Sequence, residues 1–573
     1  MCTHLEKKFK SARGPPLDRS LKILVEVRSE ARRRMALTSE QTRNPGTVSR
    51  PLKVRCRRPL LTGRPSVINR PRPTSAVSIL GLSLSVARNS LYNLVGSALP
   101  MFVSLATVPA YLAMIGTSRF GVLSITWLLL GYFGLFDLGL GLATAQRIAA
   151  LPPQAHHDRA LRFWTALLTN IGLGIAGGLL LVPVSYFYFG HVMKIEPALR
   201  SELLACVPWI AAAVPAATTS GVLTGALQGQ ERFAILNSIS VGATLAFQIV
   251  PLLAALIIGP SLLYVLPAAI LTRLAGLIVL AVVCWRSLLR GHPIAWNLAE
   301  ARAMVGFGGW TTVSALFGPL MAVGDRLSIG ALVGARSVSF YAVPFSIAER
   351  TTIIGNSVAA AAFPRIAALG GVEGRALSQA SQRFLMAVML PVICLGIFAM
   401  LPFLKLWVGP AFAAEASVPG SVIMAGMWFD CVSRAPLYAL RGYGQPRLVA
   451  FADLIQVVPY FCFLVVAIRI WGIEGAAIGY LLRVAMNYVL LSFFADTFRQ
   501  TFLGTLGAIA CLLVCVGSSF LLRPWSADWF VMLAFVLAVA PAVAFWIVTP
   551  AQREQVRSFL PNGLRFIGLS RGC

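Results

Sequence analysis

Charged side chains inside long apolar stretches are the residues of this chain most able to do chemistry. The candidates for unpaired cations in such stretches are Arg273, Arg350 and Arg483. A charge near the middle of a bilayer costs about 2.5–3.5 kcal/mol on insertion scales, so each needs a cavity or a partner. Because guanidinium binds phosphate groups bidentately, we expect these three side chains to line a cavity for an anionic ligand. The alternative is that they form interhelical ion pairs.

Two acids stand directly beside arginines in or at the end of predicted spans, as Asp325-Arg326 and Glu349-Arg350. Neighbours on a helix point about 100° apart, so neither acid neutralises its adjacent arginine well. Two arrangements remain open. Either Asp325 pairs with Arg350 and Glu349 with Arg326, or one member of each pair faces a water-filled cavity. We expect Glu349 to be the titrating carboxylate if transport is coupled to an ion.

Two further acids have structural explanations. Asp137 lies in Asp-Leu-Gly-Leu-Gly, where it could bind a proton or cation, or pair with an arginine such as Arg147. The glycines indicate close helix packing, which favours a structural role. Asp430 and Arg434 are spaced i, i+4 with the acid first, the favourable orientation for an ion pair on one helix.

Motifs for catalysis, metal binding and nucleotide binding are absent from the sequence. It has no Gly-Lys pair and therefore no phosphate-binding P-loop, and no His-Glu-x-x-His or Gly-x-Ser-x-Gly. The ten cysteines are scattered without a Cys-x-x-Cys motif, so we expect no disulfide framework and no metal site. Cys511 and Cys515 share a helix face and are interpreted as small packing residues. We expect no cofactor and no enzymatic activity.

The elements that carry these residues are apolar helices. The hydrophobic fraction is 57 % and the charged fraction 12 %, outside the soluble range of roughly 45–50 % and about 25 %. Since about 20 apolar residues cross a bilayer as a helix, we predict an all-α polytopic membrane protein with about fourteen transmembrane helices. The predicted spans are 90–115, 120–143, 164–189, 203–227, 235–258, 261–284, 304–323, 338–361, 384–404, 418–439, 449–469, 473–494, 503–522 and 528–549.

The second half of the chain echoes the first. Gln230 and Gln445 follow similar Gly-containing segments 215 residues apart (445 − 230), and Gly116 and Gly334 lie 218 apart (334 − 116). Internal repeats around a midplane site are common in secondary transporters. We therefore predict a carrier with two related six-helix bundles and two further helices. The predicted boundaries are 86–300, 301–500 and 501–550, with a tail at 551–573.

The net charge of +28 is concentrated near the N-terminus. Residues 1–85 are rich in Arg, Pro and Ser, and we predict a disordered leader there. Three interpretations stay open: a polybasic strip on anionic lipid, a transit peptide, or a start codon assigned too far upstream. Nucleic acid is not an expected partner. Lys and Arg concentrate in loops on one side, so both termini are predicted to be cytoplasmic.

The order of several short motifs resembles a known family. Asn93-Leu94-Val95-Gly96, Phe120-Gly121 and Phe136-Asp137-Leu138-Gly139-Leu140-Gly141 are similar to the opening of the Wzx-type polysaccharide flippases of the MATE-like superfamily. Phe307-Gly308-Gly309-Trp310, Gly324-Asp325-Arg326 and Tyr341-Ala342-Val343-Pro344 resemble the start of their second bundle. The resemblance covers about residues 85–500 and does not reach the leader or the last two spans.

The resemblance implies a function. Such flippases move polyprenyl-pyrophosphate-linked oligosaccharides from the inner to the outer leaflet of the bacterial inner membrane, through a cationic cavity between two bundles. The expected partners are this lipid-linked oligosaccharide, membrane lipids and other polysaccharide-assembly proteins. A lipid II flippase and a multidrug or ion antiporter of the same superfamily are the related alternatives. A membrane-embedded assembly enzyme or scaffold is the alternative of another class.

Overall fold

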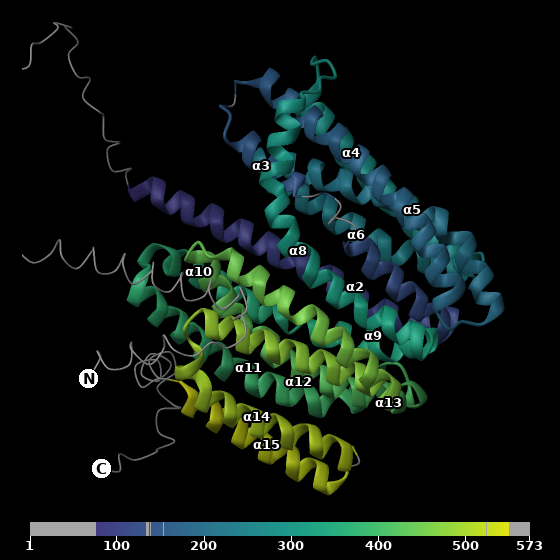
Figure 1. Cartoon of the computed structure of the whole chain (residues 1–573), viewed down its shortest axis with the longest axis vertical. Coiled ribbons are helices and arrows are strands. Elements are labelled where there is room, and N and C mark those ends of the chain that lie inside the picture. Colours follow the sequence, from purple (N-terminus) through teal and green to yellow (C-terminus); the bar gives the residue numbers. More distant parts are fainter. Residues whose placement is uncertain (1–75, 133–136, 138, 153, 523, 549–573) are drawn as a thin grey trace, which may run out of the picture. The chain divides into compact units, whose positions relative to one another are not determined.

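The computed structural model describes residues 76–548, except for 133–136, 138, 153 and 523. This part of the chain contains fourteen α-helices and no strand (Figure 1). Ten of the described helices are long and apolar enough to cross a membrane. The protein is therefore an all-α polytopic membrane protein, as predicted. The predicted leader up to residue 75 and the tail at 551–573 lie outside the described residues.

The first bundle comprises α2–α7, and two short π-helical turns extend α4 and α7. Helix α5 is central to it, since it contacts α3, α4, α6, α7 and α2. Its helices are α2 (Ala76–Tyr132), α3 (Leu140–Ala149), α4 (His156–Phe187), α5 (Pro197–Gly229), α6 (Phe233–Ile257) and α7 (Leu262–Cys284).

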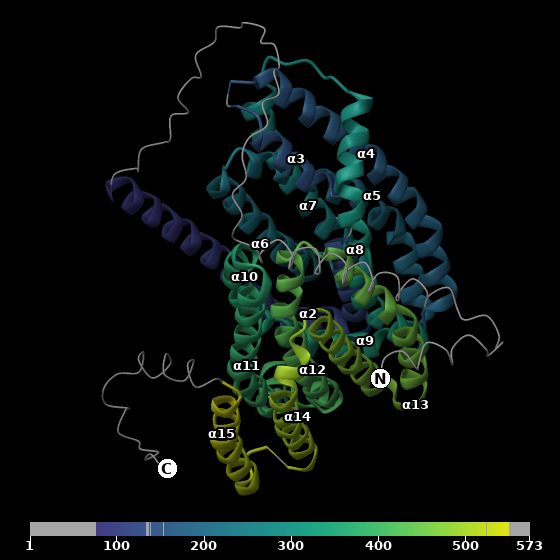
Figure 2. The same ribbon diagram turned by 60° about the vertical axis from the view of Figure 1, so that its left-hand side comes forward.

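The second bundle comprises α8–α13, and α12 is its central helix, in contact with α9, α10, α11 and α13. Helices α14 and α15 pack on α11 and lie side by side in both ribbon views (Figures 1 and 2). The bounds are α8 (Leu298–Leu332), α9 (Ala335–Glu349), α10 (Thr352–Leu369), α11 (Gly371–Trp407), α12 (Pro410–Gly442), α13 (Pro446–Phe494), α14 (Phe498–Leu521) and α15 (Ala527–Ile547).

Turns in both bundles have positive φ. Gly116 (φ 78°, ψ 166°) and Gly334 (φ 135°, ψ 169°) each precede a helix in a conformation that favours glycine. Glu231, after α5, has φ 59°, and Gly444, after α12, has φ 69°. The internal repeat stays a prediction from the sequence.

Five predicted spans differ from the observed helices. The eleventh and twelfth are joined in α13, which bends at Gly472. The first two are joined in α2, which bends at Gly116 and ends at Tyr132, so the second span is completed by the separate helix α3. The eighth span breaks at residues 350–351, between α9 and α10, while Pro344 remains inside α9. Helix α2 begins at Ala76, inside the segment predicted to be a leader.

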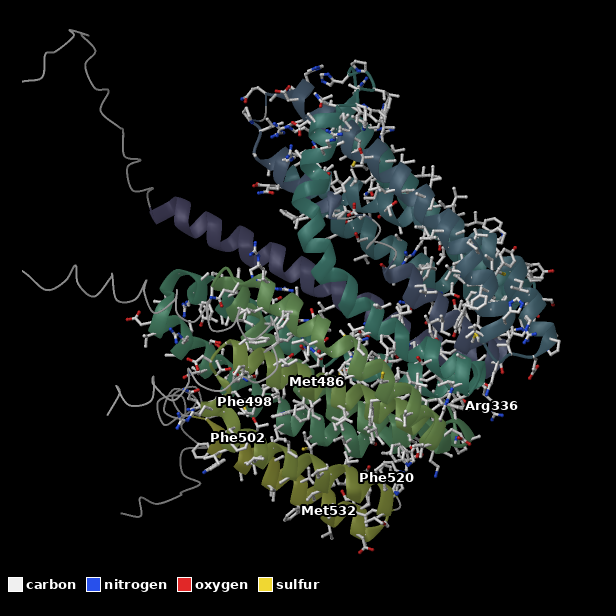
Figure 3. The ribbon with its side chains drawn as sticks, in the orientation of Figure 1. Arg336, Met486, Phe498, Phe502, Phe520 and Met532 are labelled. Atoms are coloured by element: carbon white, nitrogen blue, oxygen red, sulfur yellow. The ribbon has the colours of Figure 1, made fainter. Side chains whose placement is uncertain are left out.

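The outer surface of α14 and α15 is apolar. Phe502 and Phe520 are 43 % and 48 % exposed, and Figure 3 shows them towards opposite ends of α14. Met532 of α15 is labelled in the same view. Exposed rings along a whole helix are suited to contact with lipid chains, because they need no polar partner.

Candidate functional site

A cavity of about 330 Å³ lies inside the first bundle, between α2, α5, α6 and α7. Its polar lining consists of Arg273 and four hydroxyl side chains, which are Ser220 and Thr224 of α5 and Ser240 and Thr244 of α6. Phe247 and the backbone around Leu130 complete one wall. The cavity therefore presents one cation among neutral hydrogen-bonding groups.

A backbone carbonyl group and an aromatic ring hold Arg273 in place. Its Nη1 donates to the carbonyl oxygen of Leu130 at 2.7 Å, in the last turn of α2, where carbonyl groups lack helical partners. Its guanidinium carbon lies 4.9 Å from the centre of the Phe247 ring, a cation–π contact. No ion pair found among the described residues includes Arg273. The guanidinium is thus positioned while its charge remains uncompensated by a carboxylate.

Asp325 and Arg326 lie in the core of the second bundle. The Asp325 side chain is fully buried, and its Oδ2 accepts a hydrogen bond from the Tyr341 hydroxyl at 2.9 Å. Its Oδ1 is buried without a hydrogen-bond partner in the described part of the chain. The Arg326 guanidinium lies over the Phe345 ring at 5.3 Å.

Arg483 joins the same core through aromatic rings. Its guanidinium carbon lies 5.5 Å from the Tyr460 ring centre and 5.2 Å from that of Tyr480. It is within electrostatic range of Asp325 and of Asp453, although no ion pair is formed with either. Tyr480 in turn packs edge-on against Phe345 at 5.1 Å. Arg483 therefore belongs to a semi-buried cluster with Asp325 and Arg326.

Glu349 and Arg350 lie apart from that cluster. Both are exposed, at the end of α9 where the helix breaks before α10. The predicted pairings of Asp325 with Arg350 and of Glu349 with Arg326 are not among the ion pairs of the described residues. A break in mid-span leaves these two charged side chains accessible to a ligand or to water.

Asp137 is buried and fastens three helices. Both carboxylate oxygens accept from the Gly141 backbone N–H, at 3.2 and 3.0 Å, and the Asn170 amide donates to Oδ1 at 2.6 Å. Asn170 also donates to the Thr218 carbonyl oxygen at 2.9 Å. Arg147, considered above as a partner, instead pairs with Glu300 at the start of α8. The contacts of Asp137 connect α3, α4 and α5.

The two bundles meet at the end that carries the Gly116 and Gly334 turns. Ser339 of α9 donates to the Thr117 carbonyl oxygen at 2.5 Å. Lys194 receives the Ala335 N–H on its carbonyl oxygen at 3.2 Å, and its own N–H donates to Gly330 at 3.0 Å. Trp407 Nε1 donates to the Leu105 carbonyl oxygen at 2.9 Å. This end of the interface is closed.

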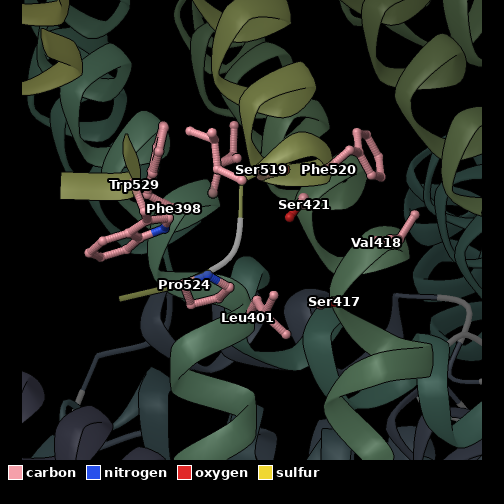
Figure 4. A pocket seen from close by; sticks show the side chains of 11 residues that line it. Phe398, Leu401, Ser417, Val418, Ser421, Ser519, Phe520, Pro524 and Trp529 are labelled. Atoms are coloured by element: carbon pink, nitrogen blue, oxygen red, sulfur yellow. The ribbon is translucent and has the colours of Figure 1, made fainter. Parts of the chain in front are cut away.

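A second cavity, at the junction of α11, α12, α14 and α15, is too small for a ligand. It measures about 20 Å³ and is lined by Phe398, Leu401, Ser421, Phe520 and Trp529, among others (Figure 4). That volume holds about one water molecule. Of these two cavities, the one beside Arg273 is therefore the better candidate for a ligand site.

Sequence reasoning missed the side chains that surround the arginines. These are the hydroxyls of α5 and α6 and the rings of Tyr341, Phe345, Tyr460 and Tyr480. All lie in stretches whose sequence predicts a membrane helix and nothing more. The spacing of Ser220 and Thr224, and of Ser240 and Thr244, at i, i+4 is the signal that could have identified a polar stripe.

The predicted ion pair between Asp430 and Arg434 on α12 is confirmed, with 2.5 Å between Oδ2 and Nη2.

Comparisons with known proteins agree on one class. A family model described as polysaccharide biosynthesis protein matches residues 86–369. A Shigella flexneri protein named as an O-antigen transporter is 26 % identical over 419 residues, which cover 71 % of this chain and 97 % of the relative. A Haloferax volcanii protein named as the low-salt glycan biosynthesis flippase Agl15 is 26 % identical over 230 residues, 37 % of this chain and 48 % of that protein.

Solved structures of two carriers share the fold. The lipid II flippase MurJ, in an inward closed conformation, has a TM-score of 0.60 at 13 % identity and covers 82 % of this chain and 100 % of its own. A multidrug resistance MATE family transporter, in an inward-facing conformation, has a TM-score of 0.58 at 14 % identity. The match covers 70 % of this chain and 97 % of the transporter.

The chain has the fold of polytopic carriers such as MurJ and the MATE transporters. The family model, the sequence relative and the fold together support a Wzx-type, MATE-like flippase. The expectation from the motifs of the first half is thereby confirmed.

Proposed function

We propose that this protein is a flippase that moves polyprenyl-pyrophosphate-linked oligosaccharide repeat units across the inner membrane for surface-polysaccharide biosynthesis. The observation that carries the proposal is the Arg273 guanidinium, which lies beside a hydroxyl-lined cavity without a carboxylate partner among the described residues. A guanidinium complements pyrophosphate, and serine and threonine hydroxyls complement sugar hydroxyls. The names of the two sequence relatives, an O-antigen transporter and a glycan flippase, favour a lipid-linked glycan as the cargo.

The other charged residues are assigned roles on the same grounds. Arg350 is proposed to extend the cationic path at the exposed break after α9, with Glu349 as the acid beside it that pairs with an ion or an arginine. Asp325 and Arg326 are proposed to couple an ion to the movement of the second bundle, because Asp325 has an oxygen without a hydrogen-bond partner in the described region. Arg483, beside them, is proposed to be a further cation for the anionic cargo. For Asp137 we propose the structural role that its three helix contacts support.

The orientation follows from the charge bias. With both termini in the cytoplasm, the closed end at Gly116 and Gly334 faces outwards, and cargo enters from the inner leaflet. The carrier then alternates between this state and one that opens outwards. Such transport involves no catalytic step, and an ion gradient or the gradient of the cargo itself would supply the energy.

Deletion of the gene tests the proposal. Lipid-linked glycans are extracted from the deletion strain, and a membrane-impermeant glycan-modifying reagent reports which leaflet holds them. A polyprenyl-pyrophosphate oligosaccharide trapped on the cytoplasmic side, with surface polysaccharide lost, is the expected result. Trapped lipid II would establish the peptidoglycan alternative instead. Unchanged glycans with new drug sensitivity would overturn the proposal in favour of an extrusion carrier.

A further inference from the structure

Three cysteines from two helices meet in the second half of the protein. Cys511 and Cys515 lie one turn apart on α14, and Cys394 lies on α11. The Sγ atoms of all three lie within 4.8 Å of one another, and those of Cys394 and Cys511 are 3.8 Å apart. All three residues are buried.

The arrangement differs from that of the other buried thiols. Cys206 and Cys284 each donate to a backbone carbonyl oxygen, those of Leu262 and Leu223, at 3.5 Å. The three clustered sulfur atoms instead face one another. A group of mutually facing soft donors is what a thiophilic ion requires, whereas packing alone needs only apolar surface.

We propose that Cys394, Cys511 and Cys515 form a three-coordinate site for a soft monovalent metal ion, Cu⁺ or Ag⁺. With metal–sulfur distances of about 2.3 Å, the sulfur atoms of a planar three-coordinate site lie about 4.0 Å apart. The observed spacing fits that geometry with only small side-chain shifts. Soft sulfur donors select Cu⁺ over the hard cations that oxygen ligands bind.

Binding requires deprotonation of the ligands, because the thiolate and not the thiol is the form of cysteine that binds a metal. Binding therefore breaks three S–H bonds, forms three metal–sulfur bonds and releases three protons to solvent. Affinity should accordingly rise with pH.

Such a site would fasten α14 to the second bundle. Helix α14 contacts α11, α12, α13 and α15, and the ion would add a bond across the α11–α14 contact. The site lies on different side chains from the cavity beside Arg273 and does not depend on the proposed transport function.

Competition for Cu⁺ tests the site. The full-length protein, purified in detergent without oxygen, is titrated against a chromophoric Cu⁺ chelator such as bicinchoninate. One ion per chain should be retained by the wild type. Cys394→Ser and Cys515→Ser should each weaken binding by more than about 100-fold, since even groups outside the ligand shell alter metal affinity by about 10–100-fold. Cys206→Ser and Cys462→Ser, which change a buried and an exposed thiol elsewhere, should bind as the wild type does.

Three results would overturn the proposal. The first is stoichiometric binding that persists in Cys394→Ser, and the second is no binding by the wild type. The third is a disulfide, detected as eight rather than ten reactive thiols when the unfolded protein is counted without reductant. X-ray absorption at the copper edge provides a direct check, because the proposal requires three sulfur neighbours.

Discussion

Gly121 of α2 packs directly against the backbone carbonyl group of Ala335, at the start of α9. A β-carbon added at Gly121 would overlap the Ala335 oxygen, so only glycine allows this approach of the two bundles. The obstruction is backbone rather than a flexible side chain. We therefore expect Gly121→Ala to force the bundles apart at this end and to disfavour the closed state.

The rate of cysteine labelling measures that change. A Ser339→Cys reporter, placed where the bundles touch, should react several-fold faster with a maleimide in Gly121→Ala than in the parent protein. Gly131→Ala is the matched control on the same helix, because a β-carbon there meets nothing within 4 Å. Equal rates in all three proteins would show that this contact does not hold the interface closed.

Removal of the Arg273 charge should impair transport without loss of the protein. Arg273→Ala eliminates a charge-assisted hydrogen-bond donor, an interaction worth about 1.5–3 kcal/mol, so surface polysaccharide export should fall by about 10–100-fold at equal expression. Arg273→Lys should recover only part of the activity, because an ammonium lacks the planar fork. Export is measured in the deletion strain complemented with each variant.

Arg469→Ala is the control for that series. Arg469 is an exposed arginine of α13 and lines no cavity described above. It should complement fully. Normal export from Arg273→Ala, with abundance matched to the wild type, would remove Arg273 from the site.

Asp137 should matter for folding more than for ion coupling. Asp137→Ala leaves the Gly141 N–H and the Asn170 amide without their carboxylate, which we expect to destabilise the protein by about 2–4 kcal/mol. Melting temperature in detergent should fall accordingly, while Asp158→Ala, at an exposed acid of α4, should have no effect. If Asp137→Ala melts like the wild type yet fails to transport, the structural assignment is wrong.

The hydroxyl of Tyr341 should stabilise the buried Asp325. Tyr341→Phe removes the hydrogen bond to Oδ2 of Asp325. The other oxygen, Oδ1, already has no hydrogen-bond partner among the described residues. We expect a loss of about 1–3 kcal/mol in unfolding free energy. The exposed Tyr264 offers the comparison, and Tyr264→Phe should unfold as the wild type does. Indistinguishable unfolding of the two variants would contradict the assigned role of the hydrogen bond.

The class of fold could be predicted because apolar length alone identifies membrane helices. The positive-φ turns at Gly116 and Gly334 were open to prediction as well, since glycine adopts such a backbone at the least cost. The positive φ of Glu231 was not, because no glycine marks that position in the sequence.

The site was only partly predictable for a related reason. Arg273, Asp325 and Arg483 are conspicuous as charges in apolar stretches, so composition identified them. Their partners are Phe247, Tyr341 and Tyr460, ordinary residues of membrane helices whose role depends on which helices become neighbours. The same limit applies to Cys394, which lies 117 residues from Cys511 in the sequence.

The contacts at the two ends of α8 bear on how this helix moves during transport. Near its start, Glu300 is bound by Arg147 of the first bundle, and near its end Gly330 and Leu332 are held by Lys194. From Glu300 to Leu332 the helix is about 48 Å long, at 1.5 Å per residue. If it pivots at Glu300, a tilt of about 10° moves the Leu332 end by about 8 Å. A small rotation of α8 at one membrane face would thus become a displacement of about 8 Å at the other face.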